Sequence, residues 1–223
     1  MAQRNRVPHP TLDEELALWQ KGYHVIGIDE VGRGAFAGPL VVGAVVYSPF
    51  FADSFRSLPE TLREVHDSKM LPEKLRTLLA KEISSQAKYV AVSEISVKVI
   101  NRVGVGKANQ IGFRTAIQKI QKHFGSSKLF VLADGFHAKY VRGIGLRNQK
   151  AIVGGDKKNF SIASASIIAK VYRDNLMKKL SLQYIGYGLD RHKGYGTEIH
   201  RQHIGELGLT AIHRRDFCRN VLT

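Results

Sequence analysis

Acidic residues recur in this sequence where a short apolar run meets glycine. Asp29 and Glu30 come between an apolar run and a glycine-rich segment, Asp134 follows an apolar run and precedes Gly135, and Asp156 follows a pair of glycines. Clustered carboxylates repel one another and lose hydration, a cost that bound divalent cations relieve. Because carboxylate oxygens suit Mg²⁺ or Mn²⁺ better than zinc, these four acids predict a site for Mg²⁺ or Mn²⁺.

Each of these acids, taken alone, also fits an ordinary structural role. Aspartate is common beside glycine in turns and at helix starts, so only the joint pattern favours a metal site. Two further acids compete for a place in it: Asp67 in HDSK and Asp174 in YRDN. Asp174 falls inside a predicted helix, where an ion pair is the more usual role, and it is the chief rival of Asp156.

Other catalytic chemistries find less support in the residues. Cys218 is the only cysteine, so neither an intramolecular disulfide nor a cysteine-based zinc site can form. His200 and His203 lack a third metal ligand in the sequence pattern, and we assign them to the surface or core of a helix. Ser164 and Ser166 lack a suitably placed base for nucleophilic catalysis.

The apolar patterns predict a sheet that begins as a meander and continues with helices between its strands. Strands are expected at residues 24–28, 40–47, 89–100, 129–133 and 150–153, the first two joined through VGRGAFAGP. Helices are expected at 72–85, 109–123, 160–182, 198–207 and 213–222, and a capping-box spacing from Thr11 to Glu14 predicts another that ends near Lys21. This order of elements indicates an α/β fold, with a mixed sheet flanked by helices and a helical C-terminal appendage.

The overall charge indicates a polyanionic partner. The chain has 34 Lys and Arg residues against 19 Asp and Glu residues, a formal net charge of +15. Such an excess is typical of proteins that bind nucleic acid. No stretch approaches the roughly 20 apolar residues that cross a bilayer, and the first residues contain no apolar signal region. We therefore expect a soluble, cytoplasmic protein without a membrane partner.

Several sequence blocks together resemble the ribonuclease HII family. The segment GIDEVGRGAFAGPLVVGAVV at 27–46 is similar to the family signature. The blocks DSK, LADG, GGD, SIASASIIAKVYRD, HKGYGT and HRRDF follow in the family's order. Arg33 and the short segment ahead of the motif favour HII over the sister family HIII, which typically has GKG. Ser164 and Asp216 depart from common family residues, and residues 94–106 match only loosely.

The resemblance implies a ribonuclease H-like fold and an endonuclease that cuts the RNA strand of RNA–DNA hybrids. It implies a two-metal site of Mn²⁺ or Mg²⁺ held by Asp29, Glu30, Asp134 and Asp156. It also implies cleavage at single ribonucleotides embedded in DNA, with 3′-hydroxyl and 5′-phosphate products. We expect a lead-in at residues 1–22, a catalytic domain at 23–190, a helical segment at 191–223 that completes the substrate cleft, and a monomer.

Substrate contacts follow from the same resemblance and from the chemistry of the 2′-hydroxyl, which both donates and accepts hydrogen bonds. Glycine allows close approach of the backbone, so the loop of Gly32, Arg33 and Gly34 is expected to read the 2′-hydroxyl. Tyr195 resembles the family tyrosine that packs against the neighbouring sugar, although a tyrosine between glycines is more often a loop anchor. Phosphate contacts are expected from basic residues of the matched blocks: Arg33, Lys69, Lys170 and Arg173.

Two other classes of function remain open on sequence grounds. A basic protein that binds nucleic acid without cleaving it would fit the charge. Another nuclease of the same fold, such as a resolvase or transposase, would fit clustered acids on a basic chain. Indifference to the 2′-hydroxyl would distinguish the second class from a ribonuclease H.

Overall fold

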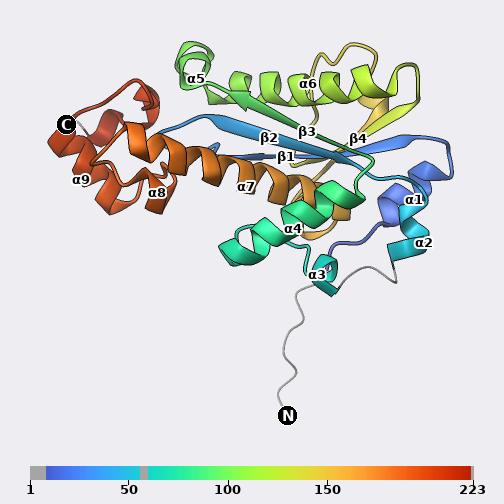
Figure 1. Cartoon of the computed structure of the whole chain (residues 1–223). Helices are drawn as coiled ribbons and strands as arrows, with labels where there is room; N and C mark the ends of the chain where they lie inside the picture. The colour runs from blue at the N-terminus through green and yellow to red at the C-terminus, as the bar shows by residue number, and fades with distance from the viewer. Residues whose placement is uncertain (1–8, 56–59, 222–223) are drawn as a thin grey trace.

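One mixed β-sheet lies between two layers of helices (Figure 1). The computed structural model describes residues 9–55 and 60–221. Helix α6 covers one face of the sheet, and α7 and α4 cover the other (Figure 1). The predicted α/β fold is therefore confirmed. The part of the predicted lead-in before residue 9 lies outside the described residues.

The sheet has the strand order β3-β2-β1-β4-β5. Its strands are β1 (His24–Val31), β2 (Leu40–Val46), β3 (Tyr89–Ile95), β4 (Leu129–Asp134) and β5 (Gln149–Ile152). The first three form an antiparallel meander, whereas β4 pairs parallel with both β1 and β5. Strands β1 and β2 are buried along nearly their whole length, because helices cover the sheet on both faces.

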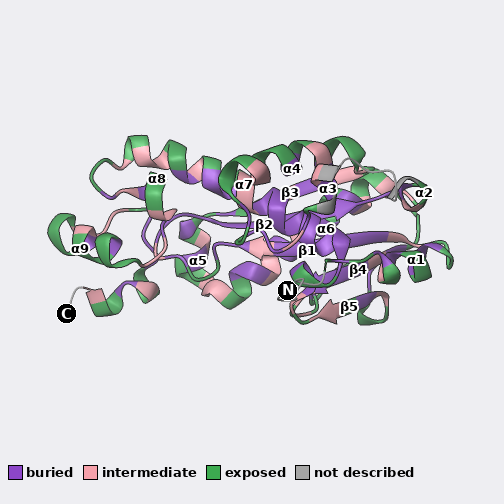
Figure 2. Ribbon diagram, turned by 90° about the horizontal axis from the view of Figure 1, so that it is seen from below, coloured by how far each residue is buried: buried purple, intermediate pink, exposed green. Residues whose placement is uncertain are grey.

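The helices of the described residues differ in length. The α-helices are α1 (Asp13–Trp19), α2 (Phe51–Phe55), α3 (Glu60–Arg63), α4 (Glu73–Gln86), α5 (Val97–Val103), α6 (Val105–Phe124), α7 (Phe160–Gln183), α8 (Leu189–His192) and α9 (Glu198–Leu207). The 3₁₀ turns within residues 9–55 and 60–221 are η1 (Leu146–Asn148), η2 (Gly155–Lys157), η3 (Arg215–Phe217) and η4 (Arg219–Val221). Figure 2 shows the buried residues concentrated in the sheet and on the inner faces of the helices.

The two largest hydrophobic clusters among the described residues lie between the layers. One lies between the sheet and α6, and it includes Ile26 and Ile28 of β1 with Phe113 and Ile117 of α6. The other lies between the sheet and α7, α4 and α1. Gly43 permits the close approach of α7, because a Cβ atom there would lie 2.4 Å from the Ala165 carbonyl oxygen. These contacts fix the ends of β1 and β4 relative to α7.

Three predictions about local structure were wrong. The capping box fails because the N-cap of α1 is Leu12 without a side-chain cap, and the Thr11 backbone pairs instead with residues next to Asn159. The strand predicted at 89–100 ends at Ile95, because Ser96 caps α5. The helix predicted at 213–222 is replaced by the turns η3 and η4; position 222 lies outside the described residues.

The C-terminal region forms a small helical layer beyond the end of α7 (Figure 1). Its apolar residues, including Leu189, Ile204 and Ile212, pack with Ala37 of the β1–β2 loop and Met177 of α7. The predicted helical appendage is thus present and is attached to the glycine-rich loop. Within the described residues, no helix is both long and apolar enough to span a membrane.

Candidate active site

Asp29 and Asp134 are neighbours because β1 and β4 run parallel. Ile28 pairs with Ala133 in the sheet register, so the next residue of each strand is an aspartate. Asp29 and Glu30 both lie inside β1, which continues three residues beyond the predicted end at Ile28. Their side chains leave opposite sides of the pleat. Asp29 interacts with Ser166 of α7, whereas Glu30 interacts with Asn109 of α6.

Asp156 lies beside this pair, on the turn that follows β5. The backbone N–H of Gly155 donates a 2.7 Å hydrogen bond to Asp134 Oδ1. A side chain at Gly155 would collide with Ile162, because a Cβ atom there would lie 2.7 Å from that side chain. The glycine pair therefore lets η2 approach the end of β4, and Asp156 comes close enough to Asp134 for their charges to interact.

A cavity of about 610 Å³ opens at this end of the sheet. Three of the four predicted acids line it, Asp29, Glu30 and Asp134, while Asp156 adjoins them. The other lining residues are Val31, Gly32, Arg33, Gly34, Ser68, Lys69, Arg76, Ser166, Lys170 and Tyr195. Six of the seven residues predicted to contact substrate thus line the same cavity as the acids, and Arg173 does not.

Two of the acids that line the cavity, Asp29 and Glu30, have raised pKa values. Burial raises the pKa of Asp29 well above its ordinary value, and the charges of Glu30 and Asp134 raise it further. Burial also raises the pKa of Glu30, and Asp134 adds to that effect, while Arg33 opposes it. Arg33 forms a 3.6 Å ion pair with Glu30. This electrostatic cost would fall if cations occupied the cluster.

Asp67 is a further carboxylate at the edge of the cluster. It is buried, accepts a 3.0 Å hydrogen bond from the Lys69 N–H, and forms a 3.8 Å ion pair with Lys157. Burial raises the pKa of Asp156, and Asp134 and Asp67 raise it further. Partial burial acts to lower the pKa of Lys69, but the nearby carboxylates outweigh that effect and raise it.

Asp174 has cationic partners on two helices. Its carboxylate oxygens lie 2.8 Å from Lys170 Nζ and 3.4 Å from Arg76 Nη2, and all three side chains are largely buried. Asp174 therefore balances two cations that border the cavity. Lys170 lies 5.9 Å from the centre of the Tyr195 ring, which places it between this ion pair and the predicted sugar contact.

Two buried arginines hold the glycine-rich loop between β1 and β2. Arg214 donates hydrogen bonds to the carbonyl oxygens of Gly32 at 2.6 Å, Arg33 at 3.0 Å and Gly38 at 2.8 and 3.0 Å. Arg173 donates to carbonyl oxygens of Pro39, Ala37 and Lys193.

The prediction that Arg173 contacts phosphate was wrong, because its side chain is fully buried and its donors are used within the protein. Burial and the neighbouring Arg173 charge lower the pKa of Arg214 to about 9. The sequence pattern missed the role of Arg214, although its block HRRDF was recognised. The residues that contact the acids, Ser166 and Asn109, and the lining residue Arg76 were also missed.

The fold requires glycine at position 32 but not at position 34. Gly32 has φ +90°, and a Cβ atom there would lie 2.1 Å from Arg173 Nε. At Gly34 a Cβ atom would meet nothing within 4 Å. The free space beside Gly34 is therefore available to a ligand.

An isolated antiparallel β-bridge to Ala35 holds Tyr195 at the cavity. Its ring lies 5.3 Å from the Arg173 guanidinium, and its carbonyl oxygen lies 2.9 Å from His200 Nδ1. His200 is fully buried and stacks on His192 at 4.2 Å, which places it in the core of the appendage. The C-terminal region thereby positions one wall of the cavity.

The residues present fit a divalent cation by the chemistry of their donors. Glu30 Oε2 is buried without a hydrogen-bond partner in the described part of the chain, and Asp29 is buried beside two other carboxylates. As the side chains stand, no group of three His, Cys, Asp or Glu residues within 9–55 and 60–221 is arranged to hold a metal ion. Occupancy would therefore require the carboxylates to turn toward one another.

Solved structures share this fold. A ribonuclease H2 from Pyrococcus horikoshii aligns with a TM-score of 0.66 at 23% identity, covering 88% of this chain and 96% of that one. Bst-RNase HIII, in complex with Mn²⁺, aligns with a TM-score of 0.72 at 20% identity, covering 90% and 70%. The RNase HII of a PCNA complex from Archaeoglobus fulgidus gives 0.68 at 24%, covering 86% and 93%. The chain thus has the ribonuclease H-like fold.

Sequence similarity narrows the class to one family. The model of the family Ribonuclease HII matches residues 26–220. The Ribonuclease HII of Chloroherpeton thalassium is 38% identical over 203 residues, covering 91% of this chain and 94% of that protein. The Ribonuclease HII of Thermosynechococcus vestitus is 39% identical over 209 residues, covering 93% and 90%. The chain belongs to the ribonuclease HII family and is a ribonuclease H enzyme.

Proposed function

We propose that this protein is an endonuclease that cleaves the RNA strand of RNA–DNA hybrids and cuts at single ribonucleotides embedded in duplex DNA. The observation that carries the proposal is the convergence of Asp29, Glu30 and Asp134 on one cavity, with the pKa values of Asp29 and Glu30 raised by burial and by neighbouring carboxylates. The products are a 3′-hydroxyl and a 5′-phosphate. The site would act within a soluble, monomeric, cytoplasmic protein.

Four carboxylates are proposed to hold the divalent ions, Mn²⁺ or Mg²⁺. Asp29 would be the central ligand, and Asp134, Asp156 and Glu30 would complete the set. When bound, two such ions supply a deprotonated water and neutralise charge that builds on the phosphate. The raised pKa of Asp29 supports this assignment, since a buried carboxylate cluster gains most from bound cations.

Recognition of the ribose is assigned to the loop of Gly32, Arg33 and Gly34. Arg214 holds the loop in place beside the cavity by binding the carbonyl oxygens of its first two residues. The open space at Gly34 would admit a sugar to the backbone, where a 2′-hydroxyl can donate and accept hydrogen bonds. A deoxyribose would leave those partners unsatisfied, which is a strong basis for discrimination.

The remaining lining residues are proposed to place the strand. Tyr195 would pack against the sugar that follows the scissile phosphate, and Arg33, Lys69 and Lys170 would contact phosphates. Tyr195 comes from the segment 191–223, so that segment would complete the substrate cleft formed with the domain at 23–190.

Three duplexes of identical sequence test this function: one all-DNA, one with a single ribonucleotide, and one RNA–DNA hybrid. With Mn²⁺ or Mg²⁺ we expect cleavage of the second and third, with a 5′-phosphate at the cut, and none of the first. Equal cleavage of all three would instead indicate a nuclease that ignores the 2′-hydroxyl. Binding of all three without cleavage would indicate a binding protein.

A further inference from the structure

The net positive charge of the protein is concentrated in one stretch of the chain, because that stretch is poor in acidic residues. Residues 95–155 contain 11 of the 34 Lys and Arg residues but only one of the 19 Asp and Glu residues, the site residue Asp134. This stretch therefore carries +10 of the formal net charge of +15. It comprises α5, α6, β4, β5 and the connecting segment 135–148. Of these, α5 and α6 lie on one side of the sheet, opposite α7 and α4 (Figure 1).

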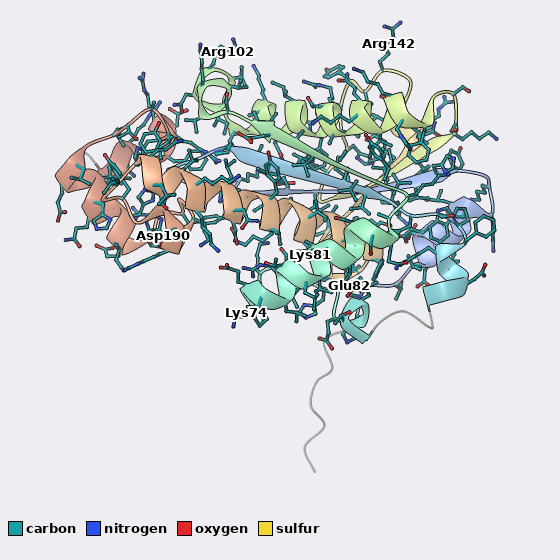
Figure 3. All side chains as sticks on the ribbon, viewed as in Figure 1. Lys74, Lys81, Glu82, Arg102, Arg142 and Asp190 are labelled. Atoms are coloured by element: carbon teal, nitrogen blue, oxygen red, sulfur yellow. The ribbon has the colours of Figure 1, made fainter. Side chains whose placement is uncertain are left out.

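The basic side chains of this stretch face outward. Figure 3 shows Arg102 and Arg142 pointing away from the α6 side of the sheet, while Lys74 and Lys81 lie on α4, across the sheet. All eleven except Arg114 are exposed. Among ion pairs in the described residues, only Lys150 of the eleven has an acidic partner, Glu14. The charge is thus uncompensated within the described structure.

Segment 135–148 runs along α6 and away from the acids. Gln110 Nε2 of α6 donates a hydrogen bond to the His137 carbonyl oxygen. Gln110 Oε1 accepts a hydrogen bond from the backbone N–H of Lys139. Further along the helix, Arg114 Nη1 donates to the Lys139 carbonyl at 3.3 Å, and Gln121 Nε2 donates to the Arg142 carbonyl at 2.8 Å. Side-chain contacts therefore fix the segment beside the helix.

Three hollows that share lining residues lead from the acids to this surface, and together they are called the depression below. Arg33 lines both the cavity of the acids and a second hollow, which is lined by Gly106, Gln110, Gly135 and Lys139. Three of these residues also border a third hollow between α6 and Tyr140: Gly106, Gln110 and Lys139.

Cations follow the depression: Lys107, Arg114 and Lys139 line the third hollow. Lys107 and Arg114 are two helical turns apart, about 10.5 Å, which is roughly the rise of three base pairs. Tyr140, 88% exposed, adds an aromatic ring at the end of the hollow. The spacing suits a phosphate backbone.

We propose that this surface, defined by Lys107, Arg114, Lys139 and Arg142, binds the duplex that flanks the cleavage site by its phosphate backbone. The inference rests on the proposed function for the identity of the substrate. The surface supplies affinity that does not depend on sequence or on the 2′-hydroxyl, whereas the cavity supplies the choice of sugar. Its contribution should depend on duplex length and on salt.

A charge-neutral triple variant tests the surface: Lys107→Gln, Lys139→Gln and Arg142→Gln. These side chains are exposed and make no hydrogen bond or ion pair that the described structure records, so the fold should persist. Arg114 is retained because it holds segment 135–148. The matched control removes three exposed lysines outside the stretch: Lys21→Gln, Lys74→Gln and Lys81→Gln.

Binding is measured by fluorescence anisotropy with EDTA present, so that it does not depend on cleavage. For a duplex of ~30 base pairs with one central ribonucleotide, the triple variant should raise Kd on the order of tenfold and lower the slope of log K against log salt by about 2–3. The control should change neither. With a duplex of ~8 base pairs, which has only about four base pairs on each side of the ribonucleotide, the triple variant should lose much less affinity relative to wild type.

Equal effects of the triple variant and the control, or equal losses on long and short duplexes, would overturn the proposal in favour of general charge attraction. No effect of the triple variant on either duplex would also overturn it, and would leave the surface to a different kind of partner. Failure of wild type to cleave the same duplex with Mn²⁺ would contradict the proposed function instead. The two failures are therefore distinguishable.

Discussion

Arg214 Nη1 donates a 2.6 Å hydrogen bond to the carbonyl oxygen of Gly32, although 182 positions separate the two residues in the chain. The bond joins the C-terminal region to the loop proposed to read the ribose. Because Arg214 is fully buried and serves three carbonyl groups, the loop geometry depends on its planar fork of donors.

Arg214→Lys should therefore damage both stability and sugar choice. Lysine keeps the charge but cannot reach all three carbonyl groups, and each buried acceptor left unsatisfied costs about 1–3 kcal/mol. We expect a lower melting temperature and a reduced ratio of cleavage at ribonucleotides to background cleavage of DNA. Arg219→Lys, at an exposed ion pair with Asp216, is the control and should change neither. If Arg214→Lys left both the melting temperature and the cleavage ratio unchanged, the guanidinium of Arg214 would not be what holds the loop in place.

Alanine substitutions at Gly32 and Gly34 should give two different defects. Gly32→Ala forces a left-handed backbone and a collision with Arg173, so it should lose roughly 2 kcal/mol or more of unfolding free energy. Gly34→Ala meets no atom within 4 Å and should keep its stability. It should instead raise KM for substrates with a ribonucleotide, because the new methyl group occupies space assigned to the sugar. Denaturant unfolding and steady-state kinetics separate the two outcomes; equal stability losses would contradict the assignment.

Asp156→Asn and Asp174→Asn distinguish the two rivals for the fourth metal ligand. Asp174→Asn leaves Lys170 and Arg76 without their anion and should cost roughly 1–3 kcal/mol of stability. Asp156→Asn removes a carboxylate whose pKa is raised by burial, so stability should hold. The Mn²⁺ concentration needed for half-maximal cleavage should rise at Asp156 and not at Asp174. The reverse pattern would assign the ligand to Asp174.

His200 should make the appendage sensitive to acid. Burial lowers its pKa to about 4, with His192, His213 and His203 adding repulsion. The unfolded chain, with a pKa near 6.5, then binds more protons than the folded protein between about pH 6.5 and pH 4. The contribution of His200 is fully present above pH 6.5 and falls by up to about 3 kcal/mol as the pH drops to 4.

The measurement compares wild type with His200→Gln. The difference in unfolding free energy between the two proteins should shrink between pH 7 and pH 5, as followed by urea titration. Carboxyl groups elsewhere titrate alike in both proteins and cancel in the comparison. A difference that stays constant with pH would show that His200 is not held neutral by burial.

Periodicity predicted the sheet well because its strands are apolar and buried on both faces. It failed at α5, where the sequence VKVINRV favours a strand by its β-branched residues. The N-cap at Ser96 and the C-cap at Gly104 instead favour a helix. The periodicity also predicted that the first strand ends at Ile28, because charged residues interrupt the apolar run there. In the structure, Asp29 and Glu30 remain paired with β2.

The lining of the cavity was more predictable than its support. The acids, the glycine loop and Tyr195 lie in distinctive blocks, whereas Arg173 and Arg214 resemble any other basic residues of a basic chain. Their burial arises only when the C-terminal region folds over the β1–β2 loop. No local pattern records a contact across 182 positions.

The most direct test of the metal-site hypothesis measures binding and cutting together on one duplex with a single embedded ribonucleotide. Wild type should bind the duplex and cleave it only with Mn²⁺ or Mg²⁺. Asp29→Asn should bind it with similar affinity and lose cleavage by several orders of magnitude across all Mn²⁺ concentrations. Cleavage by Asp29→Asn at a rate near that of wild type would contradict the assignment of the carboxylates.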